Sequence, residues 1–313
     1  MGELVIVCCH AICVDTSNPY EEPSWLLKPF QRSNPSTGKP GEHETFLLHI
    51  QAGVNALRRE GTVLVFSGAK TERDAPSSEA ASYLNVLMQC FGESDFVQQA
   101  MADGRILCED AATDSYQNLL FSLVKYYEVE EAWPHMITVI THAFKENRFL
   151  DGHAVALELP KEMIRVQGIN PPFPLLESRE VQRFEKETVD LFLRDPHGVR
   201  EPLLSKRVAR GWCTNYDPLR NIQDPSVRDT VALDQFGGYI DNVTKITKSQ
   251  QGGGSDLPRH SEKHVKCPED EGRWSTSFAR HAPNHLDFVV MPATVAATSV
   301  ASWYSFADHS GGG

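Results

Sequence analysis

Residues 4–9, Leu-Val-Ile-Val-Cys-Cys, decide the fold class of this 313-residue chain. The run is apolar at every position and lacks the alternation of a half-exposed strand, so it predicts a β-strand buried on both faces. Residues 62–66, Thr-Val-Leu-Val-Phe, repeat the pattern and lead directly into Ser67-Gly68-Ala69. Strands of this kind are typical of parallel sheets that helices cover on each side.

Amphipathic segments separate these runs from further short apolar runs. Apolar spacing predicts helices over residues 46–57, 77–90, 115–127, 144–157 and 181–193. Strands are expected over residues 105–108 and 137–141, with a further strand at 164–168. The alternation predicts an α/β domain with a Rossmann-like, doubly wound, mainly parallel sheet and flanking helices.

The regular pattern ends at about residue 195. Residues 1–195 are predicted to form the α/β domain, 196–243 a C-terminal extension, and 244–313 a largely irregular, disordered tail rich in glycine and polar residues. Residues 288–306 are uncharged and long enough to span a bilayer, but their proline, serine and threonine content argues against a membrane span. The apolar N-terminal run has no basic flank, so we expect no signal peptide.

Composition and cysteine usage indicate a cytoplasmic protein. The formal net charge is -12 and no run of lysine and arginine is present, which argues against a nucleic-acid partner. The seven cysteines include no C-x-x-C pair, so neither a zinc site nor a redox motif is predicted, and a reducing compartment fits best. No spacing of histidines, cysteines and carboxylates specifies a metal. The oligomeric state stays open.

Four polar segments directly follow predicted strands, so we expect them to converge at the carboxyl edge of the sheet. The candidate catalytic bases are Glu79 and Glu109. Lys145 and Arg148 would hold an anion, and Gly68 would let backbone N–H groups approach it. The candidate ligand-binding residues are His10, Ser67, Gly68, Ser78, Asp110, Thr113, Asn118, Thr141, His142, Lys145 and Arg148.

Each of these residues also has a purely structural interpretation. Gly68 fits a simple turn, and Glu79 fits a carboxylate in the first turn of a helix. His10 fits a hydrogen-bonded histidine at the end of a buried strand. Lys145 and Arg148 fit the solvated face of a helix. The residues alone leave both interpretations open.

In chain order, five blocks resemble the SanA/YdcF/ElyC-like family, whose shared domain has no assigned function. The family pattern is a first strand and loop, an SGG-type loop, an SEA helix start, an E-(x)n-T-x-x-N block and a TS-x-F-H-x-x-R block. The corresponding stretches are VIVCCHAI, FSGAKT, SSEAASYL, ILCEDAATDSYQN and ITHAFKENR, from residue 3 to about residue 160. The CCHAI opening and the FK-x-x-R ending look most like the fungal branch.

The resemblance implies a Rossmann-like fold with pocket contributors at Ser67, Gly68, Glu79, Glu109, Thr113, Asn118, Thr141 and Arg148. S-adenosylmethionine is an expected ligand through the resemblance alone, because one bacterial relative is associated with it. Three positions depart from the family pattern: Ala69 replaces the second glycine, His142 the serine and Lys145 the frequent histidine. Because lysine normally stays protonated near neutral pH, an acid–base role of that histidine does not transfer.

Two functions fit these observations. The first is a cytosolic enzyme, a hydrolase or transferase, that acts on a nucleotide-like or phosphorylated small molecule at the strand ends. The second is a non-catalytic sensor or binding module for a ligand of the S-adenosylmethionine type. A methyltransferase fits poorly, because the glycine fingerprint expected after the first strand is absent.

Overall fold

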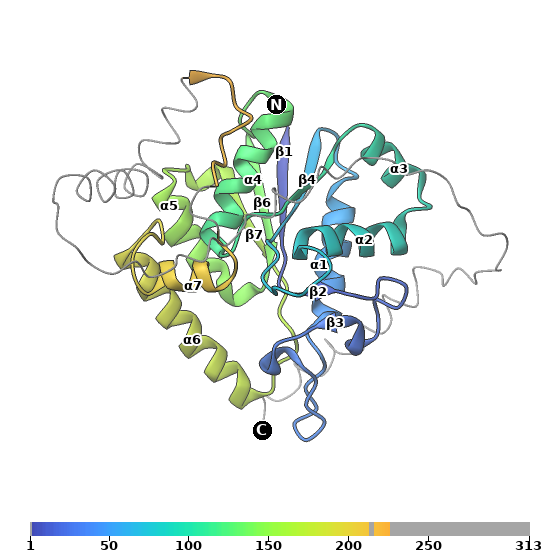
Figure 1. Cartoon of the computed structure of the whole chain (residues 1–313), viewed down its shortest axis with the longest axis vertical. Coiled ribbons are helices and arrows are strands. Elements are labelled where there is room, and N and C mark those ends of the chain that lie inside the picture. The colour runs from blue at the N-terminus through green and yellow to red at the C-terminus, as the bar shows by residue number, and fades with distance from the viewer. Residues whose placement is uncertain (1, 213–215, 226–313) are drawn as a thin grey trace, which may run out of the picture. The chain divides into compact units, whose positions relative to one another are not determined.

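The central sheet has five strands in the order β5-β4-β1-β6-β7 (Figure 1). The structure is a computed structural model that describes residues 2–212 and 216–225. The strands are β1 (Glu3–Cys8), β4 (Thr62–Ser67), β5 (Ile106–Glu109), β6 (Met136–Thr141) and β7 (Ile164–Gly168). All four neighbouring pairs run parallel, which confirms the predicted α/β fold.

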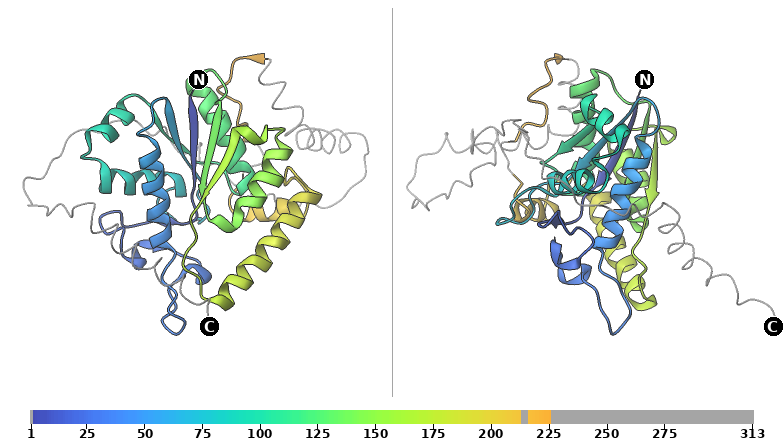
Figure 2. Two further views of the ribbon diagram at one scale, coloured as in Figure 1. Left: turned by 180° about the vertical axis from the view of Figure 1, so that it is seen from behind. Right: turned by 90° about the vertical axis from the view of Figure 1, so that its right-hand side faces the viewer.

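Helices cover both faces of the sheet. One face is covered by α1 (His43–Ala56), α2 (Glu79–Phe91) and α3 (Asp95–Ala102), and the other by α4 (Ser115–Glu130), α5 (Ala154–Ala156) and α6 (Leu175–Arg194). The side view in Figure 2 places α1 and α4 on opposite sides of the sheet. Leu4 and Ile6 of β1 are buried in one core cluster, and Val5 and Val7 in the other. Both faces of β1 are therefore apolar, as its sequence predicts.

The strand order reverses between β1 and β6. From β1 the chain builds β4 and then β5 on one side, and it later returns to place β6 and β7 on the other. At such a reversal the connections leave the sheet edge in opposite directions, which opens a crevice at the carboxyl ends of the two strands. This crevice is where a doubly wound fold binds its ligand.

The segment after β6 differs from the single helix predicted over residues 144–157. A 3-10 turn at Ala143–Lys145 is followed by a π-helical segment at Arg148–His153, and only Ala154–Ala156 is α-helical. Apolar spacing marks a helical segment but does not distinguish the wider π-helical hydrogen bonding from that of an α-helix. Short π-helical segments are frequent at functional sites.

The connection from β1 to α1 contains short regular elements. They are the antiparallel pair β2 (Ile12–Cys13) and β3 (Trp25–Leu26), and 3-10 turns at Glu22–Ser24 and Pro29–Gln31. A further 3-10 turn, Lys161–Met163, precedes β7. The sequence analysis did not predict α3, and it started α6 at residue 181 instead of Leu175.

Part of the segment assigned to a C-terminal extension belongs to the core of the domain. The segment contains α7 (Leu203–Ala209), and Leu203, Leu219 and Ile222 are buried in the same cluster as α4. The predicted tail 244–313, including the uncharged stretch 288–306, lies outside the described residues. None of the helices in the described part of the chain combines the length and apolar composition that a membrane span requires.

Candidate functional site

A pocket of about 1250 Å³ lies at the carboxyl edge of the sheet, lined by residues that end or follow β1 and β6. Small-molecule pockets generally measure about 300–1,000 Å³, so this one has room for a ligand of nucleotide size. Its walls also include the loop after β3, the start of α4, α6 and α7. Eight predicted site residues line it: His10, Glu79, Thr113, Asn118, Thr141, His142, Lys145 and Arg148.

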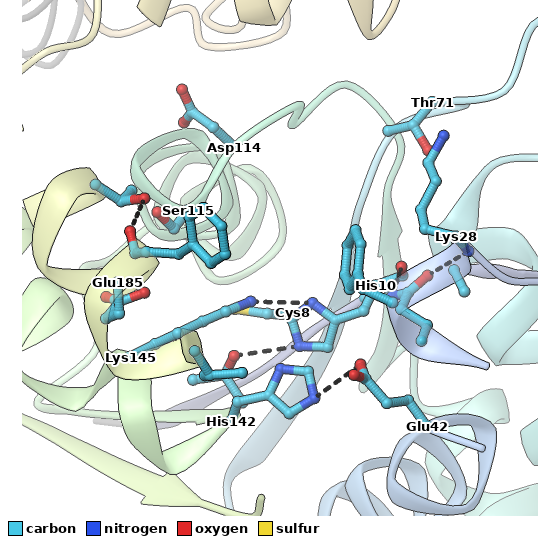
Figure 3. A pocket seen from close by; sticks show the side chains of 18 of the residues that line it. Cys8, His10, Lys28, Glu42, Thr71, Asp114, Ser115, His142, Lys145 and Glu185 are labelled. Carbon is cyan, nitrogen blue, oxygen red and sulfur yellow. Dashed lines mark hydrogen bonds and ion pairs between the residues drawn. The ribbon is translucent and has the colours of Figure 1, made fainter. Parts of the chain in front are cut away.

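Two histidines stack at the crevice between β1 and β6 (Figure 3). The rings of His10 and His142 lie with centroids 4.4 Å apart and planes 19° apart. His10 follows β1 and His142 follows β6, so the stack joins the two strands at which the order reverses. Phe144 stacks on the His142 ring at 5.0 Å. The pocket floor is therefore aromatic, with ring nitrogens at its edge.

His10 lies between Lys145 and Thr141. Its Nδ1 is 3.3 Å from Lys145 Nζ, and its Nε2 is 3.3 Å from Thr141 Oγ1. Burial and the charge of Lys145 hold the pKa of His10 well below 6.5, so the ring is neutral. Burial and the nearby Arg148 lower the pKa of Lys145 to about 8. Near neutral pH Lys145 therefore donates to Nδ1, and the ring donates its own proton from Nε2 to Thr141.

His142 faces a carboxylate that the sequence analysis did not single out. Its Nε2 is 3.8 Å from Glu42 Oε2, a distance too long for a hydrogen bond. Among the described residues neither ring nitrogen of His142 has a hydrogen-bond partner, although the side chain is buried. Burial raises the pKa of Glu42 to about 7 against the opposing effect of Lys39. Near neutral pH, Glu42 is thus divided between its two protonation states.

A cationic wall faces the histidines. Eight lysines and arginines line the pocket against seven carboxylates, in a chain whose net charge is -12. Arg148 donates from Nη2 to Glu185 Oε2 at 2.8 Å, while its buried Nε has no partner in the described structure. Arg207 pairs with Asp114, which caps α4, and Arg210 donates to the Thr113 carbonyl. The pocket lining therefore carries a small excess of cationic side chains, whereas the chain as a whole is acidic.

Glu79 is the predicted catalytic base that lines the pocket. It begins α2, is buried, and accepts a hydrogen bond from Thr71 Oγ1 at 2.5 Å. Burial raises its pKa above the ordinary value. A Cβ at Gly68 would lie 2.9 Å from Glu79 Oε2 and 3.0 Å from Cys9 Cβ. Gly68 thus makes room for the Glu79 side chain.

The other predicted residues form a separate network that does not line the pocket. Glu109 accepts from Ser67 Oγ at 2.6 Å and from the backbone N–H groups of Ala111 and Ala112 at 2.7 and 3.0 Å. Ser78 caps α2 and donates to Asp110. The residues concerned are Ser67, Gly68, Ser78, Glu109 and Asp110. Their polar atoms are engaged with one another, so their contribution to the site is positional.

Ser115 and Cys8 line the pocket and were not among the predicted site residues. Thr113 donates to Gln117 at 2.6 Å, whereas Ser115 Oγ lines the pocket and lies 2.8 Å from His153 Nε2. Ser115 is three residues before Asn118, so the T-x-x-N spacing points to Ser115 rather than Thr113. Cys8 also lines the pocket, but burial raises its pKa to about 11, so it remains a thiol.

No set of three metal-binding side chains occurs within residues 2–212 and 216–225. No protein-family model matches the chain, so its resemblance to the SanA/YdcF/ElyC-like family remains a prediction. The chain is similar to the uncharacterized protein YOR238W of Saccharomyces cerevisiae, with 26% identity over 257 residues that cover 66% of this chain and 83% of the yeast protein. No solved structure matches it.

Proposed function

We propose that this chain is a cytosolic enzyme that binds a phosphorylated or nucleotide-like small molecule in the pocket and acts on it by acid–base chemistry. The observation that carries the proposal is an imbalance of charge beside the stacked histidines. Lys145 and Arg148 lie together in the pocket, and Glu185 is a carboxylate partner of Arg148. No carboxylate within the described residues lies within 4.0 Å of Lys145.

The imbalance favours an anionic ligand. A buried cation without a directly paired carboxylate is destabilising, and an anion that enters the pocket removes this cost. Arg148 Nε, which has no partner among the described residues, offers a donor, and charge-assisted hydrogen bonds to phosphate are among the strongest in proteins. A phosphate group would therefore complete the contacts of Lys145 and Arg148.

The same pocket offers groups suited to proton transfer near neutral pH. Lys145, with a pKa of about 8, and Glu42, with a pKa of about 7, can each exchange a proton near neutral pH. Glu79 is a second base, because burial raises its pKa as it raises that of Glu42. Glu109 is not assigned this role, since three hydrogen bonds already occupy its carboxylate.

A thermal-shift titration of the full-length chain tests this proposal. The ligands are nucleotides, sugar phosphates, isoprenoid phosphates and S-adenosylmethionine, since a ligand that binds only the folded state raises the melting temperature. We expect phosphorylated compounds to stabilise the chain, and Arg148→Met to remove the effect. Arg183→Met is the matched control, because Arg183 lies on the exposed surface of α6 and is paired with Glu187.

Two results would overturn the proposal. Equal stabilisation of Arg148→Met and the unmodified chain would place the anion elsewhere. Stabilisation by S-adenosylmethionine alone, without turnover of any compound, would favour the non-catalytic binding module. The cationic wall argues against that module, because the ligand carries a positively charged sulfonium group.

A further inference from the structure

Lys145 differs in its partners from two other lysines that line the pocket. Lys28 pairs with Glu72, and Lys39 lies near Glu42 and Glu177 at 3.8 and 3.4 Å. The partner of Lys145 is instead a neutral imidazole, His10 Nδ1, at 3.3 Å. Carboxylate partners keep a lysine protonated, whereas an imidazole accepts a hydrogen bond and can also accept the proton itself.

The surroundings of Lys145 make the neutral amine available. Three carboxylates carry charge opposite to that of the protonated amine and act on it: Glu42 before α1, Glu79 of α2 and Glu185 of α6. A like charge comes from Arg148, and the other titratable groups that face the amine are Cys8, His10, His49 and His142. With a pKa of about 8, about a fifth of the amine is neutral at pH 7.4, against under about 0.1% for an ordinary lysine. A neutral amine is a nucleophile toward carbonyl carbon.

We propose that Lys145 forms an imine with the aldehyde or ketone group of a phosphorylated ligand. This inference rests on the proposed function and specifies its substrate class as a phosphorylated carbonyl compound. Arg148, three residues further along the chain and with a free Nε donor, binds the phosphate. The pocket, at about 1250 Å³, has room for both groups.

The covalent step needs only the amine, the carbonyl compound and one proton carrier. Lys145 Nζ attacks the carbonyl carbon, and His10 Nδ1 carries one proton from the nitrogen to the carbonyl oxygen to give a carbinolamine. His10 Nδ1 then carries the second nitrogen proton to the hydroxyl group, which leaves as water while the C=N bond forms. His10 can stay hydrogen-bonded to Thr141 Oγ1 through Nε2, so the ring remains in place. Nothing is oxidised or reduced.

Pyridoxal 5′-phosphate tests this chemistry directly, because it carries both an aldehyde and a phosphate. The full-length chain is incubated with this probe at pH 7.4, treated with sodium borohydride to reduce any imine to a stable secondary amine, and mapped by peptide mass spectrometry. We expect Lys145 to be modified at least about tenfold faster than Lys161, whose side chain is 79% exposed. Inorganic phosphate should slow the modification of Lys145 selectively.

Three variants separate the parts of the proposal. Lys145→Arg keeps the positive charge and should lose the adduct while retaining inorganic phosphate binding. Lys161→Arg is the matched control and should label normally at Lys145. His10→Gln should slow trapping at Lys145 without preventing probe binding, because the proton carrier is removed while the amine remains.

The outcomes distinguish this inference from the proposed function. If the probe binds in competition with inorganic phosphate but Lys145 is not modified, the imine is overturned and the anion site stands. If the probe modifies only exposed lysines and phosphate has no effect, both proposals fail. If pyridoxal without its phosphate labels Lys145 equally fast, the amine is reactive but the phosphorylated substrate class is overturned.

Discussion

The two halves of one sheet edge use polar residues in opposite ways. At the ends of β4 and β5, Ser67, Glu109 and the backbone N–H groups of Ala111 and Ala112 satisfy one another. At the ends of β1 and β6, His10, His142 and Lys145 face a pocket, and the ring nitrogens of His142 have no partner in the described structure. One half is a closed hydrogen-bond network, and the other is open to a ligand.

The difference follows from the topology of the sheet. After β4 and β5 the chain turns into α2 and α4, and polar side chains there cap helices and stabilise the turns. The order reverses between β1 and β6, so a crevice remains at the carboxyl ends of these two strands. The same residue types can therefore be engaged with one another beside one strand and face a pocket beside its neighbour.

Removing the carboxylate of the closed network should cause the largest loss of stability. Glu109→Ala leaves Ser67 Oγ and two backbone N–H groups buried without their acceptor. We expect the free energy of unfolding to fall by roughly 3–4 kcal/mol, measured by urea denaturation. Inorganic phosphate should still bind the folded fraction with unchanged affinity, since Glu109 does not line the pocket. A loss of phosphate affinity without a loss of stability would reverse the roles of the two halves.

The closed half should also determine part of the pH dependence of stability. Burial raises the pKa of Glu109 from 4.5 to about 7 in the folded state. Between these values the folded state binds more protons than the unfolded state, so the free energy of unfolding falls as the pH rises from 4.5 to 7. We expect this residue to contribute a fall of up to about 3 kcal/mol, at about 1.4 kcal/mol for each pKa unit.

Glu109→Gln isolates the contribution of this residue. The variant cannot ionise, so its stability should change less between pH 5 and pH 8 than that of the unmodified chain. Glu42→Gln serves as the comparison in the open half, because its pKa is also raised to about 7. Parallel stability curves for Glu109→Gln and the unmodified chain would show that Glu109 does not titrate in this range.

The sequence predicted the sheet because its features follow from local patterns. Uninterrupted apolar runs identified β1 and β4, and helices between the strands required a parallel sheet. The polar residues expected after the strands lie at the carboxyl edge of the sheet, and eight of them line the pocket. The sequence did not show which of them would satisfy one another, since the bond between Ser67 and Glu109 joins two strands.

Residues of the open half were harder to identify because distant segments bring them together. Glu42 reaches His142, and Glu185 reaches Arg148 from α6. A single sequence without an assigned relative carries no signal for such pairs. Ser115 is different, since its T-x-x-N spacing to Asn118 was present in the motif.

A methyl group at Gly68 tests how closely the two halves are packed together. The added Cβ of Gly68→Ala would lie 2.9 Å from Glu79 Oε2 and 3.0 Å from Glu79 Cβ, so the Glu79 side chain must move. We expect a loss of roughly 1–3 kcal/mol in the free energy of unfolding. Gly152→Ala is the matched control, because its added Cβ meets no atom within 4 Å in the described structure apart from its chain neighbours and its own helix backbone. Equal stability of the two variants would show that Gly68 is a simple turn residue.

Replacing Lys145, in the open half, should have the smallest effect on stability, and this effect should be a gain instead of a loss. Lys145 has no carboxylate within 4.0 Å among the described residues, so Lys145→Met removes a desolvated charge and should raise the free energy of unfolding by roughly 1 kcal/mol at pH 7. Lys39→Met removes a buried lysine that lies near Glu42 and Glu177, and it should lower the free energy of unfolding by roughly 1–2 kcal/mol.

Because folding lowers the pKa of Lys145 from 10.5 to about 8, the unfolded state binds more protons between these values, and the unmodified chain gains stability as the pH rises through this window. The advantage of Lys145→Met should therefore diminish from pH 8 to pH 10. Stability that falls in Lys145→Met as much as in Lys39→Met would show that the Lys145 charge is already compensated, and the open half would then need no anion.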